Sequence, residues 1–169
     1  MKTHPIKTQA QKAADFEALH KASGVFVIPN PWDPGSARIL AGLGFPALAT
    51  SSGAEAGVLG KRDGSVTRDE ALAHAREIVP ATDLPVAADL ENGFAESPEQ
   101  VAETIRLAAE AGLVGGSIED FTGDKAKPFY EPALAAQRIA AAVAAARALP
   151  FPFPLTAPCE HFLRGRADL

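Results

Sequence analysis

Residues 84–93 read LPVAADLENG, a short apolar run that ends in two acids and a glycine. Its length and composition predict a strand over its first six residues. A helix is expected on each side of this strand. The segment TRDE at 67–70 is a capping box that opens one helix, and SPEQ at 97–100 opens another that ends near Gly112. A strand between two helices is the repeating unit of an α/β fold.

The same alternation extends along the rest of the chain. Asp33 followed by Pro34 is a helix start, because aspartate caps a helix and proline suits its first turn. Helices are predicted over 9–22, 34–43 and 132–148. Strands are predicted over 25–28, 45–50, 114–118 and 153–157. The first of these has the continuous apolar pattern of a strand buried on both faces, whereas prolines weaken the last one.

This order of elements predicts an α/β fold with parallel strands and right-handed crossovers. The two architectures that fit are a doubly wound sheet and a TIM (β/α)₈ barrel, and the local pattern barely separates them. A complete barrel usually takes about 250 residues, and the chain has 169 residues. The barrel interpretation therefore predicts a single partial-barrel domain over 1–169, with about the first five strand–helix units, from an incomplete sequence.

Composition narrows the possible environments and partners. The chain is 47% hydrophobic and carries a net charge of −5 with its charges interleaved, so nucleic acid is not an expected partner. Cys159 is the only cysteine, which excludes an intrachain disulfide and a thiolate-rich metal cluster. Neither a signal-peptide core nor a run of about 20 apolar residues is present. We expect a cytoplasmic protein without a membrane segment.

Polar residues follow each predicted strand, at the edge where α/β folds bind their ligands. Asp89 and Glu91 are two positions apart, so extended chain would place both carboxylates on one face. Two such charges raise each other's pKa unless a cation lies between them. Glu119 could add a third carboxylate, and oxygen ligands of this kind suit magnesium. Taken singly, each acid could instead cap a turn or face solvent.

Other polar groups carry weaker signals. Ser51, Ser52 and Gly53 offer hydroxyls and backbone N–H groups that could hold a carboxylate or phosphonate, although Ser/Gly turns are common. Cys159 and His161 have no partner at a recognisable catalytic spacing, and a single cysteine usually serves packing. The glycines at 112–116 do not form a nucleotide-binding motif.

Five segments together resemble a known superfamily. In chain order they read NPWDPGSA at 30–37, FPALATSSG at 45–53, LGKRDG at 59–64, DLENGF at 89–94 and SIED at 117–120. They are similar to the isocitrate lyase/phosphoenolpyruvate mutase superfamily, in particular to its small bacterial members described as phosphonomutase-like or carboxyvinyl-carboxyphosphonate phosphorylmutase-like. The similarity runs from about residue 15 to the end.

The resemblance implies a TIM barrel that binds small 2-oxo or phosphono acids with magnesium, or with manganese in its place. It also implies a reaction that makes or breaks C–C or P–C bonds through an enolate. It implies that Asp89 binds the metal, directly or through water, with Glu91, Glu119 and Asp63 completing or supporting the shell. Substrate would be held by Ser51, Ser52 and the amides near Gly53, in a site that also includes Trp32, Asp33 and Glu160. A full-length barrel of this family is expected to be a homo-oligomer.

Three departures from the family pattern bear on activity. The segment FTGDKAK at 121–127 stands where isocitrate lyases carry a Lys-Lys-Cys-Gly-His loop, which disfavours cleavage of isocitrate or methylisocitrate. Pro158 stands where the family commonly has an arginine that grips the substrate anion. Strands six to eight are missing, and a barrel cannot close without them. The alternative hypothesis is therefore an inactive truncated homologue or an assembly partner. A doubly wound binding domain would require the motif order to be coincidental.

Overall fold

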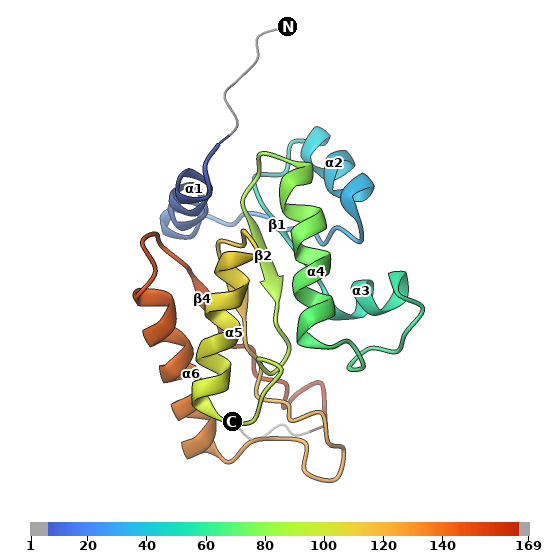
Figure 1. Ribbon diagram of the computed structural model, residues 1–169, viewed down its shortest axis with the longest axis vertical. Coiled ribbons are helices and arrows are strands. Elements are labelled where there is room, and N and C mark those ends of the chain that lie inside the picture. The colour runs from blue at the N-terminus through green and yellow to red at the C-terminus, as the bar shows by residue number, and fades with distance from the viewer. Residues whose placement is uncertain (1–6, 166–169) are drawn as a thin grey trace, which may run out of the picture.

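The computed structural model describes residues 7–165, in which helices alternate with short parallel strands (Figure 1). The α-helices are α1 (Gln9–Lys21), α2 (Pro34–Gly42), α3 (Ser52–Val58), α4 (Arg68–Ile78), α5 (Pro98–Glu110) and α6 (Pro132–Arg147). A 3₁₀ turn, η1 (Val79–Ala81), follows α4. The strands are β1 (Leu48–Ala49), β2 (Val86–Asp89), β3 (Gly116–Ser117) and β4 (Leu155–Thr156).

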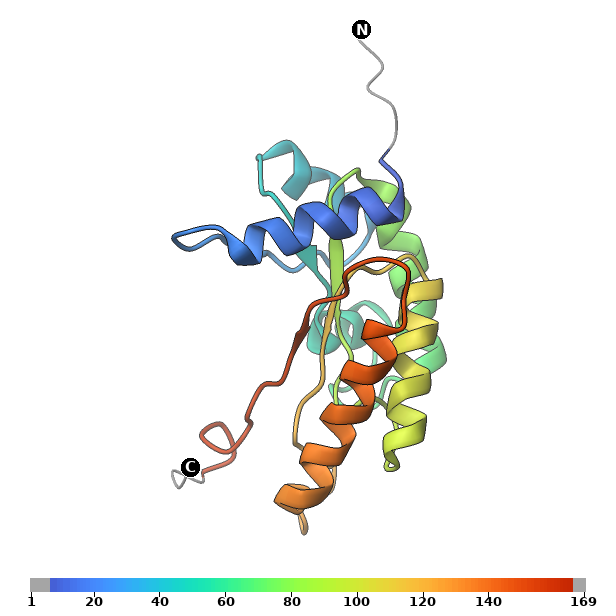
Figure 2. The same ribbon diagram turned by 90° about the vertical axis from the view of Figure 1, so that its left-hand side faces the viewer.

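The four strands pair in the order β1-β2-β3-β4, and every pair is parallel. A doubly wound sheet reverses its strand order at a switch point, whereas a barrel wall keeps its strands in sequence. Right-handed crossovers between successive neighbours place the connecting helices on one side of the sheet. In agreement, α5 packs against both α4 and α6 (Figure 2). The fold is thus an α/β barrel wall, which confirms the predicted partial TIM barrel.

The helices α2, α4 and α5 start as predicted, because each has a side-chain cap. Thr67 and Glu70 form the capping box of α4, and Asp33 accepts a hydrogen bond from the Ser36 amide at the start of α2. Ser97 caps α5 in the same way through the Gln100 amide. These caps fix the helix starts within a residue of the predicted positions.

The prediction of a strand over residues 25–28 is wrong. The hydrogen bonds to β1 begin only beyond it, where the Ala49 amide donates to the Pro29 carbonyl at 3.2 Å. Alternate side chains of an extended segment point to opposite faces. Phe26 packs toward α1, while Val27 is 62% exposed because no described element covers its face. The segment is extended chain covered on one side.

Helix α1 closes the end of the sheet where the strands begin (Figure 2). Its Phe16 is buried against Ala87 and Val114. The Gln9 amide group donates to the carbonyls of Ala109 and Leu113 at 2.7 and 2.9 Å. With one end of the wall covered in this way, the opposite end, where the strands finish, remains available for a binding site.

Candidate functional site

Asp89 ends β2 and joins two neighbouring loops. Its Oδ2 accepts a hydrogen bond from the Ser52 amide at 3.0 Å, and its Oδ1 accepts one from the Glu91 amide at 3.0 Å. The hydroxyls and backbone N–H groups of residues 51–53 were predicted to hold a substrate anion; in the structure this segment is the start of α3, with the Ser51 hydroxyl as the cap. In this structure the Ser52 amide is therefore bound to a carboxylate of the protein itself.

Glu91 lies on strained backbone in a half-buried position. Its φ is 45°, in the left-handed region that non-glycine residues seldom adopt. Its Oε1 is buried and has no hydrogen-bond partner among residues 7–165. Burial, followed by the charges of Asp89, Asp63 and Glu55, raises the pKa of Glu91 to about 7. A carboxylate in such surroundings is stabilised by a proton or by a cation.

Glu119 lies beside Glu91 because β3 runs parallel to β2. The Glu119 amide donates to the Glu91 carbonyl at 2.8 Å. Burial, then the charges of Glu160, Asp89 and Glu91, raises the pKa of Glu119 to about 7, and Arg164 opposes this effect. The structure thus brings three of the four predicted metal ligands to the same edge of the sheet.

Asp63 reaches the same region from the loop after α3. A side chain at Gly53 would meet the Asp63 carboxylate at 3.6–3.7 Å, so the two residues are in contact distance. The donor atoms of Asp89, Glu91, Glu119 and Asp63 nevertheless do not include any three within 4.8 Å of one another. Among residues 7–165 only Asp120, Cys159 and His161 form such a group. The assignment of the four acids as ligands stays a prediction.

Arg138 of α6 holds the loop that follows Glu91 in place. Arg138 is almost fully buried, and its guanidinium donates to the carbonyls of Asn92, Ala95 and Glu96. It also stacks on the Tyr130 ring at 3.8 Å. Three carbonyl contacts to one rigid, planar group hold this loop in a single conformation.

A cavity of about 310 Å³ opens on the inner face of the strands. Its polar lining comes from α1 and from the strands and the segments beside them, and it consists of His20, Asn30, Thr50, Ser51, Asp89, Ser117 and Thr156. Hydroxyl and amide groups of this kind donate hydrogen bonds to anionic oxygens. Asp89 therefore lines the cavity. It also lies beside the other predicted metal ligands, Glu91 and Glu119.

The other predicted substrate residues occupy different positions. Trp32 is 62% exposed, and its carbonyl contacts the His74 ring at 2.8 Å. Asp33 caps α2, and the hydrogen bonds from Ser36 lower its pKa. Neither residue lines the cavity. Glu160 pairs with Arg164 at 3.3 Å and lies close enough to Glu119 to raise its pKa.

A buried Glu55–His74 pair was not predicted. Glu55 is 3% exposed and His74 8% exposed, with Oε2 and Nδ1 3.5 Å apart. They come from α3 and α4, and no short-range spacing rule links them. Glu55, and then the Trp32 carbonyl, raises the pKa of His74 above its ordinary 6.5, although burial opposes this.

We expect this pair to make stability pH-dependent. Because the folded pKa of His74 is raised, its contribution is fully present below pH 6.5 and is lost as the pH rises through the raised value. The stability difference between wild type and His74→Gln should therefore be larger at about pH 5.5 than at about pH 9. Urea unfolding of both proteins measures it. In a Glu55→Gln background this pH dependence should shrink, because the largest cause of the raised pKa is removed. An undiminished pH dependence there would contradict the pairing.

None of the helices in residues 7–165 combines the length and the hydropathy needed to span a bilayer. A profile of the family described as phosphoenolpyruvate phosphomutase matches residues 16–169. A candidate lyase/mutase from Burkholderia cenocepacia J2315 superimposes with a TM-score of 0.93 at 59% identity, over 95% of this chain and 58% of that chain. The 2-methylisocitrate lyase of Halalkalibacterium halodurans is 35% identical over 115 residues, which are 68% of this chain and 38% of the relative.

A phosphonopyruvate hydrolase, solved in complex with oxalate and Mg²⁺, has a TM-score of 0.84 at 21% identity, over 91% of this chain and 54% of that chain. At this identity the likeness concerns the fold alone. The chain spans roughly half the length of these relatives.

Proposed function

Because the chain belongs to the phosphoenolpyruvate mutase family of the isocitrate lyase superfamily, we propose that this protein is a magnesium-dependent lyase or mutase. Its substrate would be a small 2-oxo or phosphono acid, and the reaction would make or break a C–C or P–C bond through an enolate. Residues 1–169 would form one domain, equivalent to the N-terminal part of the barrel. The segment 121–127 lacks the cysteine loop, so isocitrate is not the proposed substrate.

The buried, unpartnered Oε1 of Glu91 carries this proposal. Glu91 is surrounded by the charges of Asp89, Asp63 and Glu55, with Glu119 beside it. Buried charges are found paired or bound to metals, because an uncompensated buried charge is costly. A divalent cation would supply the missing charge, and oxygen-only ligands suit magnesium, or manganese in its place.

Asp89, Glu91 and Glu119 would hold the ion, with Asp63 supporting them. When bound, magnesium would act as a Lewis acid that stabilises negative charge on the substrate oxygens. Ser51 lines the cavity, and its hydroxyl would donate to the substrate carboxylate. The Asp89 hydrogen bond to the Ser52 amide fixes this serine turn relative to the acids.

The size of the cavity supports a small substrate. Its volume of about 310 Å³ lies at the lower end of the range of about 300–1,000 Å³ found for ligand pockets. Glu160 does not line the cavity, and the contacts of Trp32 and Asp33 are with α2 and α4. We therefore propose that Ser51 and Asp89 contact the substrate directly. Glu160, Trp32 and Asp33 would have a more distant role.

The test is turnover of phosphonopyruvate and oxaloacetate with magnesium and with chelator. Because the chain spans roughly half of its relatives, both the 169-residue chain and a chain extended with the remaining strands of the Burkholderia cenocepacia relative should be assayed. We expect magnesium-dependent turnover in the extended chain, and a homo-oligomer. Magnesium binding without turnover of either acid would instead favour the inactive homologue.

A further inference from the structure

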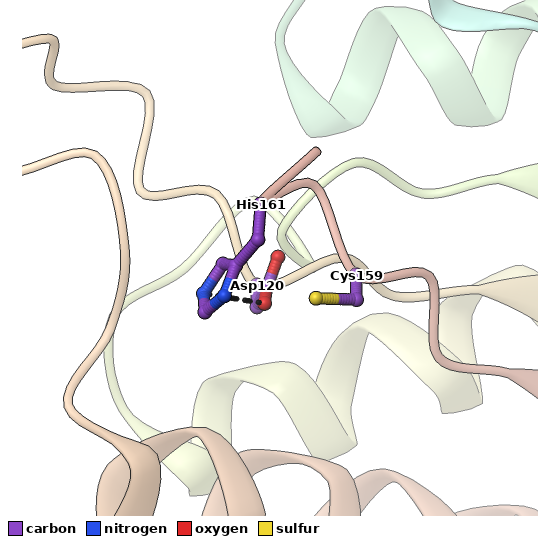
Figure 3. Close-up of side chains that lie close together, drawn as sticks. All are labelled: Asp120, Cys159 and His161. Atoms are coloured by element: carbon purple, nitrogen blue, oxygen red, sulfur yellow. Dashed lines mark ion pairs between the residues drawn. The ribbon is translucent and has the colours of Figure 1, made fainter. Parts of the chain in front are cut away.

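Three side chains with different metal-binding atoms meet beyond the ends of β3 and β4 (Figure 3). A carboxylate oxygen of Asp120, the sulfur of Cys159 and a ring nitrogen of His161 all lie within 4.8 Å of one another. Figure 3 shows the Cys159 sulfur pointing toward the Asp120 carboxylate, with the His161 ring on the other side of it. The three residues are drawn together by the fold, since β3 pairs in parallel with β4.

The Asp120 carboxylate is oriented by the backbone. Its Oδ1 accepts a hydrogen bond from the Glu160 amide at 2.9 Å, so Oδ2 faces Nε2 of His161 at 3.4 Å. Hydrogen bonds of this kind behind a ligand are what hold metal-binding groups in position.

The His161 ring is held by packing. Phe129 makes an edge contact with it, with the ring centroids 4.1 Å apart. Nδ1 of His161 is buried and has no hydrogen-bond partner among residues 7–165. The side chain is about one-fifth exposed, as is that of Asp120, and Cys159 is exposed. An ion can therefore reach the group from solvent.

The distances suit a tetrahedral ion. Nitrogen and oxygen ligands at about 2.0–2.2 Å from zinc lie about 3.4 Å apart at a tetrahedral angle, and the Asp120–His161 distance is 3.4 Å. A thiolate at about 2.3 Å would lie about 3.6 Å from each of them. Because the sulfur lies within 4.8 Å of the other two atoms, it would have to approach by at most about 1 Å, which a side-chain rotation can supply.

We propose that Asp120, Cys159 and His161 bind a borderline-soft divalent cation such as zinc. A thiolate and an imidazole select zinc-like ions over magnesium, which prefers oxygen ligands. Three protein ligands also leave a fourth position open to water or to a small anion. The site shares no ligand with the four acids proposed to bind magnesium, so it stands or fails independently of the proposed function.

Cobalt(II) is the probe, because a cobalt–thiolate bond gives a charge-transfer band in the near ultraviolet that oxygen and nitrogen ligands do not give. Cys159 is the only cysteine of the chain, so any such band reports this residue. We expect one cobalt–thiolate site per chain, with a band that zinc displaces and magnesium does not, and loss of the band in Cys159→Ser. Zinc affinity should fall by at least about 100-fold in His161→Asn and Asp120→Asn, since even groups behind a ligand contribute 10–100-fold.

Asp89→Asn is the matched control, because it removes a carboxylate from the other acidic group and should leave the cobalt band unchanged. Circular dichroism of each variant checks that it is folded. The absence of a band at saturating cobalt would overturn the proposal. So would a cobalt affinity, measured from the band, that is unchanged in His161→Asn or Asp120→Asn. A band that saturates at one cobalt to two chains would also overturn it, because Cys159 would then bind the ion between molecules.

Discussion

Magnesium should raise the melting temperature of the wild-type protein and leave that of Asp89→Asn unchanged. A ligand that binds only the folded state stabilises it by mass action, by about 2.7 kcal/mol when its concentration is 100 times its Kd. Asp89 is the one predicted ligand that both lines the cavity and contacts the acidic group. Asparagine keeps one oxygen to accept from the Ser52 or Glu91 amide, so the variant loses charge with little loss of shape.

The control for this experiment is Asp120→Asn. Asp120 also follows β3 and its side chain is 22% exposed, but it does not belong to the proposed magnesium set. Its magnesium response should equal that of wild type. The comparison is made by thermal denaturation with and without magnesium, each at matched ionic strength. A magnesium response in Asp89→Asn as large as in wild type would remove Asp89 from the ligand set.

Restoring a cation at position 158 should increase turnover strongly. Pro158 follows β4, two positions after Thr156 of the proposed substrate cavity, and it borders a second cavity that Glu119 and Asp120 line. An arginine there could make a charge-assisted, bidentate contact with a substrate anion, which proline cannot make. Such a contact is worth about 2–5 kcal/mol, or on the order of 30-fold to several thousand-fold in kcat/KM. The assay is oxaloacetate and phosphonopyruvate turnover by the extended chain carrying Pro158→Arg.

Two variants separate charge from geometry at this position. Pro158→Lys supplies a point charge without the planar fork, and we expect a smaller gain from it. Pro158→Met supplies length without charge and should give no gain. Arginine in the 169-residue chain should not rescue activity, because the far edge of β4 has no strand partner among residues 7–165. A monomeric 169-residue chain with Pro158 that turned over either acid at ordinary enzyme rates would refute this prediction.

Local signals in the sequence were sufficient for five of the six α-helices, all except α3, and for the order of the strands. The caps at Asp33, Thr67 and Ser97 act within one helical turn, so a short stretch of sequence contains the whole interaction. The parallel sheet followed from the alternation of elements. The acids also reached the same edge, because the direction of each strand fixes where its last residues lie.

What the sequence could not indicate depends on contacts between distant segments. Residues 25–28 have the composition of a buried strand, but burial depends on what covers each face. The serines at 51 and 52 are typical of a turn, and the sequence did not indicate that the Ser51 hydroxyl caps helix α3. The grouping of Cys159 with Asp120 arises from the pairing of two strands, and no spacing rule along the chain describes it.

At position 91, the residue that would stabilise the fold best differs from the residue that the proposed metal site needs, because the backbone there is left-handed. Glycine adopts φ 45° without strain, whereas a residue with a Cβ is penalised by about 1 kcal/mol or more there. Selection for folding alone would therefore favour glycine at 91, and a glutamate persists under selection only while its carboxylate contributes something that folding does not require. The residue type found at position 91 in related proteins can thus indicate whether they still use this carboxylate. In a lineage that had given up the reaction, this position would be among the first to drift, and it would drift toward greater stability.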